Sequence, residues 1–372
     1  MKISTSKENL VKGIQTIQAG MSSKTGTMPI LNNFLLETAE NEITVVFTDL
    51  EMAVKHVIPV TVKEAGSITI PLKKFMEFIQ NLGNTPELNV SSDDVTNKIT
   101  VNSGKTRFSL SGSPKNEYPQ IPDLNETNSF KLPALAVGEM INSVLFSASK
   151  EEDRHFLNGL LWKFEGGTLS MVGTDGRRLS INTLKTDAIS KDFKVIVPLK
   201  VLQEVSRYIK SLSSDSKEEL YVGLASNQIG FKISKTQFIS RLLEGTFPSY
   251  EQIIPTDSQI KVSVKAGELL AVTKRAAICS NDRAGSVRYT FKKGMLIINS
   301  QSQNMDFEDE LPSDYAGEED FQISFNPKFI LDILNTVGEV NITAQFKAPN
   351  MPAMFTLEGK DMPVYIVMPL RV

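Results

Sequence analysis

The chain is poor in the residue types that most often supply metal ligands and nucleophiles. Its 372 residues include one cysteine, Cys279, and two histidines, His56 and His155. A single cysteine excludes an internal disulfide, and the cysteine and histidines do not have the spacing of a zinc site. A Ser-His-Asp or Cys-His centre would need one of these residues, and the chain has no Gly-x-Ser-x-Gly motif. We therefore expect no enzymatic activity, no cofactor and no metal, and a structural role for His56.

Long apolar runs and a strong net charge are also missing. No apolar run is long enough to span a bilayer, and the first residues, MKISTSKENL, lack the apolar core of a signal peptide. We therefore expect a cytoplasmic protein with no membrane partner. The net charge of −3 by itself argues weakly against a nucleic-acid partner. The sequence SGKT at 103–106 resembles the end of a phosphate-binding loop, but Ile99 stands where that motif needs glycine.

The main positive feature of the chain is a threefold repeat. Residues 66–82, 194–210 and 321–337 each contain a short β-rich run, a proline, a lysine and a helix-like pattern of apolar residues at three- and four-residue steps. The lysines are Lys73, Lys200 and Lys328, which are 127 and 128 residues apart. A period of this length corresponds to a whole domain. Three copies of a domain without catalytic motifs suggest a binding surface.

A second repeated block precedes each of these helices and predicts a β-hairpin, because residues alternate around a short turn. The first two blocks share a Thr-Asp pair, at 48–49 and 174–175, which the third block has lost. Asp175 could be imagined as an acid site. The recurrence of Thr-Asp favours a turn-capping role, since both side chains bond nearby backbone amides.

Another amphipathic helix is expected before each hairpin, near 6–21, 136–149 and 266–279. Each repeat is thus helix, hairpin, further strand, helix and strands. This order predicts an α+β fold in which two helices lie on antiparallel sheets. Loops rich in proline and tyrosine mark the ends of the first two repeats. We therefore expect three domains, at residues 1–125, 126–256 and 257–372.

The charges separate between helices and the rest of the chain. The six expected helices carry a net charge of +7, whereas the remainder carries −10. Lysine and arginine are good helix formers, so surface helices can be basic for that reason alone. Recurrence in three domains favours a polyanion-binding face instead. Few aromatic residues accompany the charges, so contacts with the phosphates of duplex DNA, which read no sequence, are expected rather than base stacking.

Longer segments of the chain resemble the bacterial sliding clamp, the β subunit of DNA polymerase III. The similarity lies in RHFLNGLLWKFEGGTLSMVGTDGRRLS of the middle repeat, RFSLSG of the first, AAICSNDR of the third and the final YIVMPLRV. It runs in register from the first helix to the last residue. The combination of TDGRRL with a terminal MPLR is specific, although each piece alone is weak.

The resemblance implies three clamp domains of the processivity fold in each chain and a head-to-tail homodimeric ring. The helices of such a ring surround duplex DNA, which gives processivity to the replicative polymerase. The implied partners are duplex DNA, the replicative DNA polymerase, a clamp loader and other proteins that carry a clamp-binding motif. The first and third repeats lack the full TDGRRL pattern, so peptide binding is expected only in the middle repeat.

The resemblance also assigns three sets of residues. A partner-peptide pocket with apolar walls falls on Arg154, Leu157, Thr174, Gly176, Arg177, Arg178, Leu179, Pro248, Ile253, Ile366, Val367, Met368, Pro369, Leu370 and Arg371. The subunit interface falls on Phe108, Leu110 and Ile278, flanked by opposite charges at Lys105, Arg107, Asp306, Glu308 and Glu310. The DNA-facing cations are Lys12, Lys24, Lys73, Lys200, Arg207, Lys210, Lys274 and Lys328.

Packing inside the protein is an alternative role for some members of these sets. Leu179 and Met368 could be ordinary core residues, and Leu110 could pack inside its own domain. A different class of function is a monomeric scaffold of three repeats that binds proteins and never closes on DNA. An enzyme with an unrecognised carboxylate site is a third alternative, which the shortage of histidine and cysteine disfavours.

Overall fold

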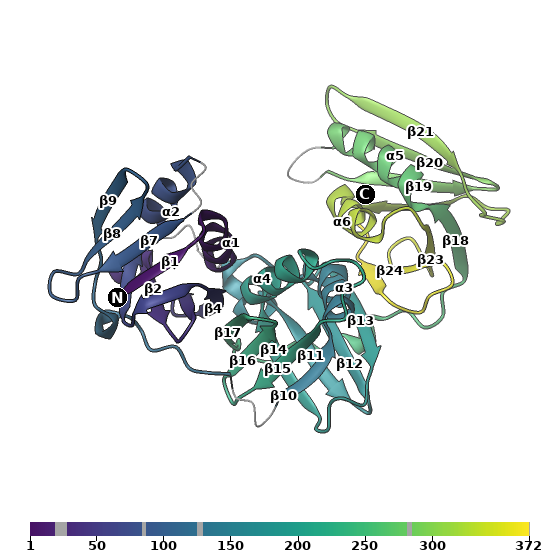
Figure 1. Ribbon diagram of the computed structural model, residues 1–372. Helices are drawn as coiled ribbons and strands as arrows, with labels where there is room; N and C mark the ends of the chain where they lie inside the picture. Colours follow the sequence, from purple (N-terminus) through teal and green to yellow (C-terminus); the bar gives the residue numbers. More distant parts are fainter. Residues whose placement is uncertain (19–27, 84–86, 125–128, 281–284, 372) are drawn as a thin grey trace. The chain divides into compact units, whose positions relative to one another are not determined.

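The computed structural model describes residues 1–18, 28–83, 87–124, 129–280 and 285–371. Figure 1 labels the helices and most of the strands. The described residues contain six α-helices, two for each sequence repeat. They are α1 (Lys7–Gln18), α2 (Leu72–Asn81), α3 (Ala134–Leu145), α4 (Leu199–Lys210), α5 (Ala266–Cys279) and α6 (Pro327–Val337).

The described residues form two compact units. The first consists of Met1–Gly138 and Lys200–Leu242, and the second of Glu139–Leu199 and Leu243–Val372. The middle repeat therefore contributes strands to both units. Every strand pair in the four sheets described below is antiparallel.

The first unit contains two sheets. One has the strand order β5 (Thr61–Glu64), β1 (Lys2–Thr5), β7 (Leu88–Ser92), β8 (Lys98–Ser103) and β9 (Thr106–Ser111). The other joins two repeats, in the order β10 (Ser129–Pro133), β15 (Glu219–Leu224), β16 (Gln228–Ile233), β17 (Thr236–Arg241), β4 (Met52–Pro59), β3 (Glu42–Thr48), β2 (Asn33–Thr38) and β6 (Ser67–Pro71).

The second unit also contains two sheets. The larger joins the middle and third repeats, in the order β14 (Phe193–Pro198), β11 (Gly159–Glu165), β12 (Thr168–Thr174), β13 (Arg178–Lys185), β25 (Val364–Val367), β24 (Ala353–Leu357), β23 (Asn341–Phe346) and β18 (Ile260–Lys265). The smaller has the order β21 (Asp306–Pro312), β20 (Met295–Gln301), β19 (Val287–Lys292) and β22 (Phe321–Phe325).

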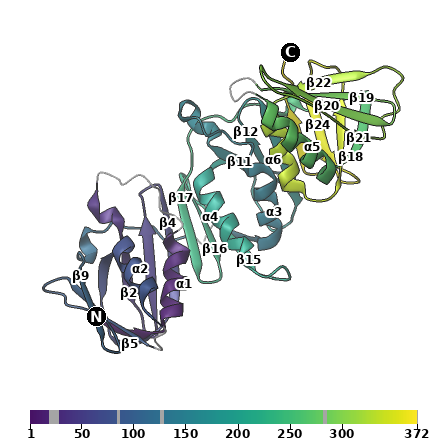
Figure 2. The same ribbon diagram turned by 90° about the horizontal axis from the view of Figure 1, so that it is seen from above.

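The helices bury one apolar face against the sheets and against each other. In α2, Leu72, Phe75, Met76 and Ile79 are buried, which is the three- and four-residue spacing seen in the sequence. Helix α1 contacts α2 and strands β3 and β4, while α5 contacts α6 and the strands of the smaller sheet. Figure 2 shows α1 beside α2 and α5 beside α6. The predicted α+β fold, with two helices on antiparallel sheets in each repeat, is confirmed.

The three repeated lysines occupy the same place in the fold. Lys73, Lys200 and Lys328 are each the second residue of a helix, α2, α4 and α6. Asn326 caps the start of α6, because its side chain accepts a hydrogen bond from the Lys328 backbone N–H. Among the described residues, no helix is long and apolar enough to cross a membrane.

His56 lies where the first two repeats meet. It is on β4, and its Nδ1 atom lies 2.8 Å from the Thr236 hydroxyl oxygen on β17. Burial, reinforced by the nearby charges of Lys235 and Lys12, lowers the pKa of His56 to about 4. The imidazole is therefore neutral at physiological pH, and the expected structural role fits its position in the strand pair that joins two repeats.

Candidate functional site

The residues expected to form a peptide pocket all lie in the second unit. They come from the short 3-10 helix Glu152–Leu157, the turn between β12 and β13, the loop after Leu243 and the end of the chain. Leu157, Leu179 and Ile366 belong to one buried apolar cluster together with Phe247 and Tyr250. The more accessible members are Arg154, Gly176, Arg177, Pro248, Ile253 and Met368.

The turn at 174–178 is held by its own side chains. The Asp175 Oδ1 atom accepts hydrogen bonds from the backbone N–H groups of Arg177 and Arg178, at 2.9 and 3.0 Å. The Thr174 hydroxyl donates to the Arg178 carbonyl and accepts from the Gly176 N–H. Gly176 has a φ of 83°, a left-handed conformation that glycine adopts without strain. The turn-capping role predicted for Asp175 is confirmed.

Arg154 lies over this turn. A Cβ atom built on Gly176 would be only 3.0 Å from the Arg154 Nη1 atom. Arg154 itself departs from helical geometry inside its 3-10 helix, with φ −127° and ψ 62°. The arginine and the glycine turn therefore form one exposed edge of the candidate pocket. A side chain at position 176 would have to displace the guanidinium.

The two arginines of the motif have different roles. Arg177 is exposed, whereas Arg178 is 9% exposed and all three guanidinium nitrogens are used inside the molecule. They donate to Asp175, to Asp332 of α6 and to the carbonyl oxygen of Phe146, at 3.0, 2.6 and 2.6 Å. Arg178 was assigned to the pocket by resemblance. Its side-chain contacts link the turn to α6.

Aromatic rings complete the surroundings of Arg178. The guanidinium carbon lies 4.7 Å from the centre of the Phe329 ring on α6 and 5.5 Å from that of Phe146. A cation over an aromatic face is attracted by the ring quadrupole, most strongly where water is excluded. Arg178 thus joins the middle and third repeats through ion pairs, a backbone carbonyl and two rings.

The last residues of the chain separate into different environments. Val364 and Ile366 of β25 join the cluster at the candidate pocket, whereas Tyr365 and Val367 join the core that contains α6. The Met368 N–H donates to the Arg177 carbonyl and leaves a side chain that is 40% exposed, while Pro369 is half-buried. Leu370 and Arg371 line another cavity, of about 600 Å³, beside β22. At this end of the chain, Met368 is thus the accessible residue beside the candidate pocket, while Ile366 is buried in its apolar cluster.

The residues assigned to the subunit interface lie on two strands that end their sheets. Phe108 and Leu110 are on β9, with the ring of Phe108 stacked on Phe78 at 3.9 Å between centres. Arg107, on the other face of β9, is exposed, as is Lys105 in the preceding turn. On β21, Asp306, Glu308 and Glu310 alternate with less exposed residues.

Two further residues belong with these edges. Ile278, near the end of α5, is 71% exposed, which is high for an isoleucine. Exposed apolar side chains of this kind are common where another protein surface binds. Phe78 was not identified from the sequence. It lies on α2 outside the buried stripe of Phe75 and Ile79. Its place off the helical apolar face is the feature of the sequence that could have identified it.

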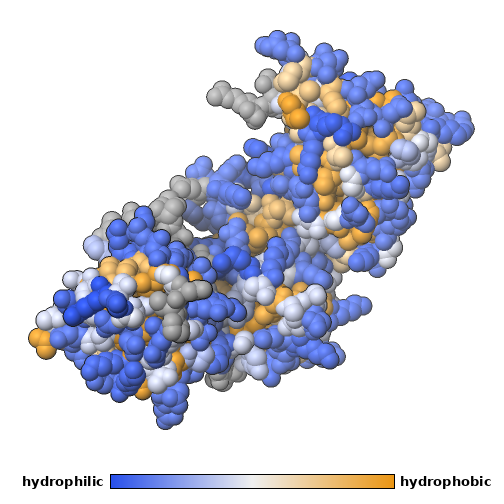
Figure 3. Space-filling model, turned by 45° about the horizontal axis from the view of Figure 1, so that its top comes forward, coloured by the Kyte–Doolittle hydropathy of each residue, from blue (hydrophilic) through white to orange (hydrophobic). Residues whose placement is uncertain are grey.

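Most of the candidate DNA-facing cations are exposed and unpaired. Within the described ranges, Lys12, Lys73, Lys210, Lys274 and Lys328 are exposed and make no ion pair with a carboxylate. Arg207 is exposed and pairs with Glu204 one turn earlier. Lys24 lies outside the described residues. Hydrophilic side chains cover most of the face drawn in Figure 3, with smaller hydrophobic patches between them.

Lys200 differs from the other lysines. It is half-buried on α4 and pairs with Asp49, in the turn of the first repeat that corresponds to the Asp175 turn. Burial lowers the pKa of Lys200, while Glu204 acts in the opposite direction. Half-buried and paired with a carboxylate, Lys200 contributes less net positive charge to the surface than the exposed, unpaired lysines of its set.

The chain matches known families along its whole length. Models of the DNA polymerase III beta subunit match residues 1–122 (N-terminal domain), 131–249 (central domain) and 251–371 (C-terminal domain). The Haemophilus influenzae beta sliding clamp is 33% identical over 339 residues, covering 91% of this chain and 90% of that protein. The Escherichia coli beta sliding clamp is 30% identical over 373 residues and both chains are covered completely.

Solved structures give the same result. The DNA polymerase sliding clamp from Bacillus subtilis aligns with a TM-score of 0.93 and 27% identity, covering 100% of this chain and 99% of that one. A sliding clamp from Pseudomonas aeruginosa bound to griselimycin aligns with a TM-score of 0.92 and 28% identity over both complete chains.

The contacts of Arg178 predict a stability difference between the two adjacent arginines. Arg178→Ala should lower the free energy of unfolding by about 3 kcal/mol, because it leaves the carboxylates of Asp175 and Asp332 without the cation that they share. Arg177→Ala should change it by less than about 0.5 kcal/mol, since Arg177 is exposed. Urea unfolding of both variants measures this difference. Equal stabilities would show that Arg178 does not join the repeats.

Proposed function

The chain belongs to the DNA polymerase III beta subunit family and is a DNA sliding clamp, a processivity factor without a catalytic site, and we propose that two copies close head to tail into a ring around duplex DNA. The proposed domains are residues 1–125, 126–256 and 257–372. The first of these boundaries lies outside the described residues. The proposed location is the cytoplasm.

Support for the ring comes from a strand junction that occurs twice inside the chain. Strand β4 of the first repeat pairs with β17 of the second, and Val54 lies opposite Phe238. Strand β13 of the second repeat pairs with β25 of the third, and Ser180 lies opposite Tyr365. In both junctions the strand that follows a hairpin, β4 or β13, pairs with the last strand of the next repeat, β17 or β25. Each partner strand places a buried aromatic ring at the same position.

The same two strand types occur a third time, as β9 and β21, and no described strand pairs with their outer edges. The sequence KTRF at 105–108, which leads into β9, matches KTQF at 235–238, which leads into β17, at three of four positions, so Phe108 corresponds to Phe238. In the third hairpin block, Phe307 of β21 corresponds to Val54 and Ser180. Strands β9 and β21 are the last strands of their sheets. An unpaired edge strand is a template for another chain.

The internal register predicts the register between two copies. Phe307 of one copy should lie opposite Phe108 of the other, on the face that carries Phe78. The neighbouring positions then place Glu308 opposite Arg107, and Glu310 opposite Lys105. Both pairs join opposite charges on the exposed face, which favours this register over pairings displaced along the strands. Because the two edges differ, the contact is head to tail, and closure after two copies gives a ring.

The helices supply the proposed DNA face. Lys12, Lys73, Lys210, Lys274 and Lys328 lie on five of the six helices, and their charges are not neutralised by described carboxylates. Lysine ammonium groups on flexible stems attract phosphates without reading bases. Such contacts let a ring move along duplex DNA.

The proposed partners of the ring are the replicative polymerase, a clamp loader and other proteins with a short hydrophobic motif. The motif would bind at the edge formed by Arg154, Gly176, Pro248, Ile253 and Met368. Support comes from the exposure of Ile253 and Met368, 43% and 40%, beside the buried cluster of Leu157 and Leu179. An apolar cleft with a few polar groups at its rim suits a peptide, and methionine adapts to several partners.

A disulfide test addresses the predicted register. Opposed residues of an antiparallel pair have Cα atoms about 4.5–5.5 Å apart, within the range that a disulfide spans. In a Cys279→Ser background, Arg107→Cys combined with Glu308→Cys should give a covalent dimer on mild oxidation, seen on a non-reducing gel. Arg107→Cys combined with Asp306→Cys, two residues out of register, is the control. Preferential cross-linking of the control pair would reject the register.

A ligand test addresses the pocket. Griselimycin, with which the P. aeruginosa clamp was crystallised, should bind this chain, and Ile253→Asp should weaken that binding at least about tenfold because a charge enters the apolar edge. Met351→Asp is the matched control, since Met351 is 42% exposed but lies outside the pocket. Calorimetry measures both. The same affinity for the two variants would place the ligand elsewhere.

A further inference from the structure

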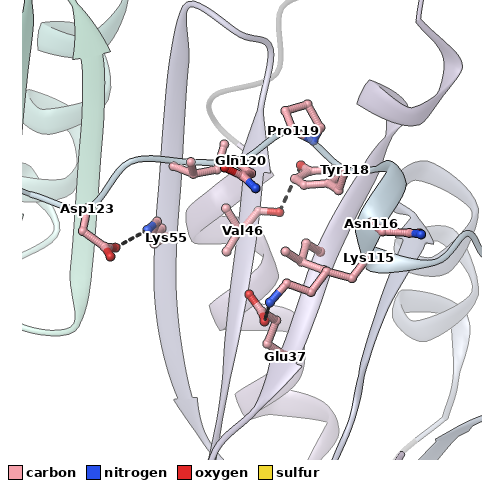
Figure 4. Close-up of a pocket in the computed structure, with 11 residues that line it drawn as sticks. Glu37, Val46, Lys55, Lys115, Asn116, Tyr118, Pro119, Gln120 and Asp123 are labelled. Atoms are coloured by element: carbon pink, nitrogen blue, oxygen red, sulfur yellow. Dashed lines mark hydrogen bonds and ion pairs between the residues drawn. The ribbon is translucent and has the colours of Figure 1, made fainter.

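A second cavity lies in the first repeat, away from the candidate peptide pocket. It measures about 730 Å³ and lies between the outer face of β2, β3 and β4 and the segment Lys115–Asp123 that crosses them. We call this segment the first strap. Figure 4 shows it passing above the three strands, with Glu37, Val46 and Lys55 below it. Volumes of this size are typical of ligand sites.

The first strap is fastened at three points. At one end Lys115 pairs with Glu37 of β2, and at the other Lys55 of β4 pairs with Asp123, 2.6 Å away. In the middle the Tyr118 hydroxyl lies within hydrogen-bond distance of the Thr48 N–H and of two backbone carbonyl oxygens. The space beside Tyr118 is lined by Leu35, Val46 and Ile121. The strap is therefore held in place while the space beside it stays open.

The middle repeat contains the same sheet face and a longer strap. Leu161 pairs with Val172 there, as Leu35 pairs with Val46 in the first repeat. We call residues 247–255 the second strap. It contains Phe247-Pro248 and Ile254-Pro255, which correspond to Tyr118-Pro119 and Ile121-Pro122. Between them the second strap has five residues, Ser249–Ile253, where the first has only Gln120.

The extra residues of the second strap include an aromatic side chain that fills the space. Tyr250 is 8% exposed and belongs to the same buried cluster as Leu161 and Val172. The corresponding cluster of the first repeat consists of Leu35, Val46 and Tyr118, with Ile30 and Ile121 packed against it, and contains no second ring among the residues that the structure describes. The same sheet face is thus packed by two rings, Phe247 and Tyr250, in the middle repeat, whereas the described residues of the first repeat pack one ring on it and leave a cavity beside that ring.

We propose that the cavity under the first strap binds an aromatic side chain, tyrosine or phenylalanine, presented by a partner protein. The ring would pack on Leu35, Val46 and Ile121, as Tyr250 packs in the middle repeat. Aromatic rings bury a large area at little cost in conformational entropy. A phenol oxygen would reach the Lys115–Glu37 pair, just as Tyr250 has the charges of Lys163 and Glu251 near it. The proposal does not depend on ring closure or on the peptide pocket.

The test uses methyl groups that line the cavity as reporters. In full-length protein with ¹³C-labelled Leu, Val and Ile methyls, p-cresol and N-acetyl-tyrosinamide should shift the signals of Leu35, Val46 and Ile121 in a saturable manner. The dissociation constant should be roughly millimolar, as for a single side chain. N-acetyl-leucinamide, the aliphatic control, should bind at least fivefold more weakly. Absence of shifts up to the solubility limit, or equal binding of the leucine compound, would overturn the proposal.

A graft tests whether the site is equivalent to that of Tyr250. Replacing Gln120 by the sequence Ser-Tyr-Glu-Gln-Ile of residues 249–253 should fill the cavity and weaken p-cresol binding at least tenfold. The control graft carries alanine in place of the tyrosine and should still bind. If the longer strap unfolds the protein, Gln120→Trp replaces it as the test. Its indole ring, at an exposed strap position, should occupy the cavity and weaken p-cresol binding. Unchanged p-cresol binding in a folded tyrosine graft or in Gln120→Trp would contradict the proposal.

Discussion

Antiparallel pairing between the edge strands of successive repeats is the interaction on which the rest of the structure depends. It makes one sheet from β10, β15–β17, β4, β3, β2 and β6, and another from β14, β11–β13, β25, β24, β23 and β18. Each junction joins the strand after a hairpin of one repeat to the last strand of the next repeat, and among the described strands β21 and β9 are the strands of these two kinds that end a sheet. The proposed ring would pair them by repeating a contact that already exists twice.

Charged side chains reinforce the two internal junctions at equivalent turns. Asp49 holds Lys200 of α4, and Asp175, through Arg178, holds Asp332 of α6. The third repeat has no Thr-Asp pair, so the proposed junction between copies would lack this reinforcement. It would depend on strand pairing, the rings near Phe108 and the exposed charge pairs. Such an interface would be weaker than the internal junctions, which would suit the proposed ring if a clamp loader opens it.

Periodicity in the sequence was sufficient to predict the helices and hairpins, because apolar spacing and turn residues act locally. The recurrence of Thr-Asp also predicted the cap at Asp175, where one carboxylate oxygen accepts from the backbone N–H groups two and three residues further along. The sequence could not distinguish Arg177 from Arg178, since the partners of Arg178 are 154 and 32 residues away. Nor could it reveal that Lys200 is paired with Asp49, or that a strap four residues shorter leaves a cavity in the first repeat.

Topological linkage to DNA is the central claim, and retention on circular DNA tests it most directly. The protein would be loaded on a nicked circular duplex with a clamp loader and ATP, gel-filtered in high salt, and the DNA then linearised. A closed ring should be retained on the circle and lost from the linear form, because it slides off a free end while phosphate contacts are screened by salt. Equal, salt-sensitive binding to both forms would mean a basic surface without a closed ring.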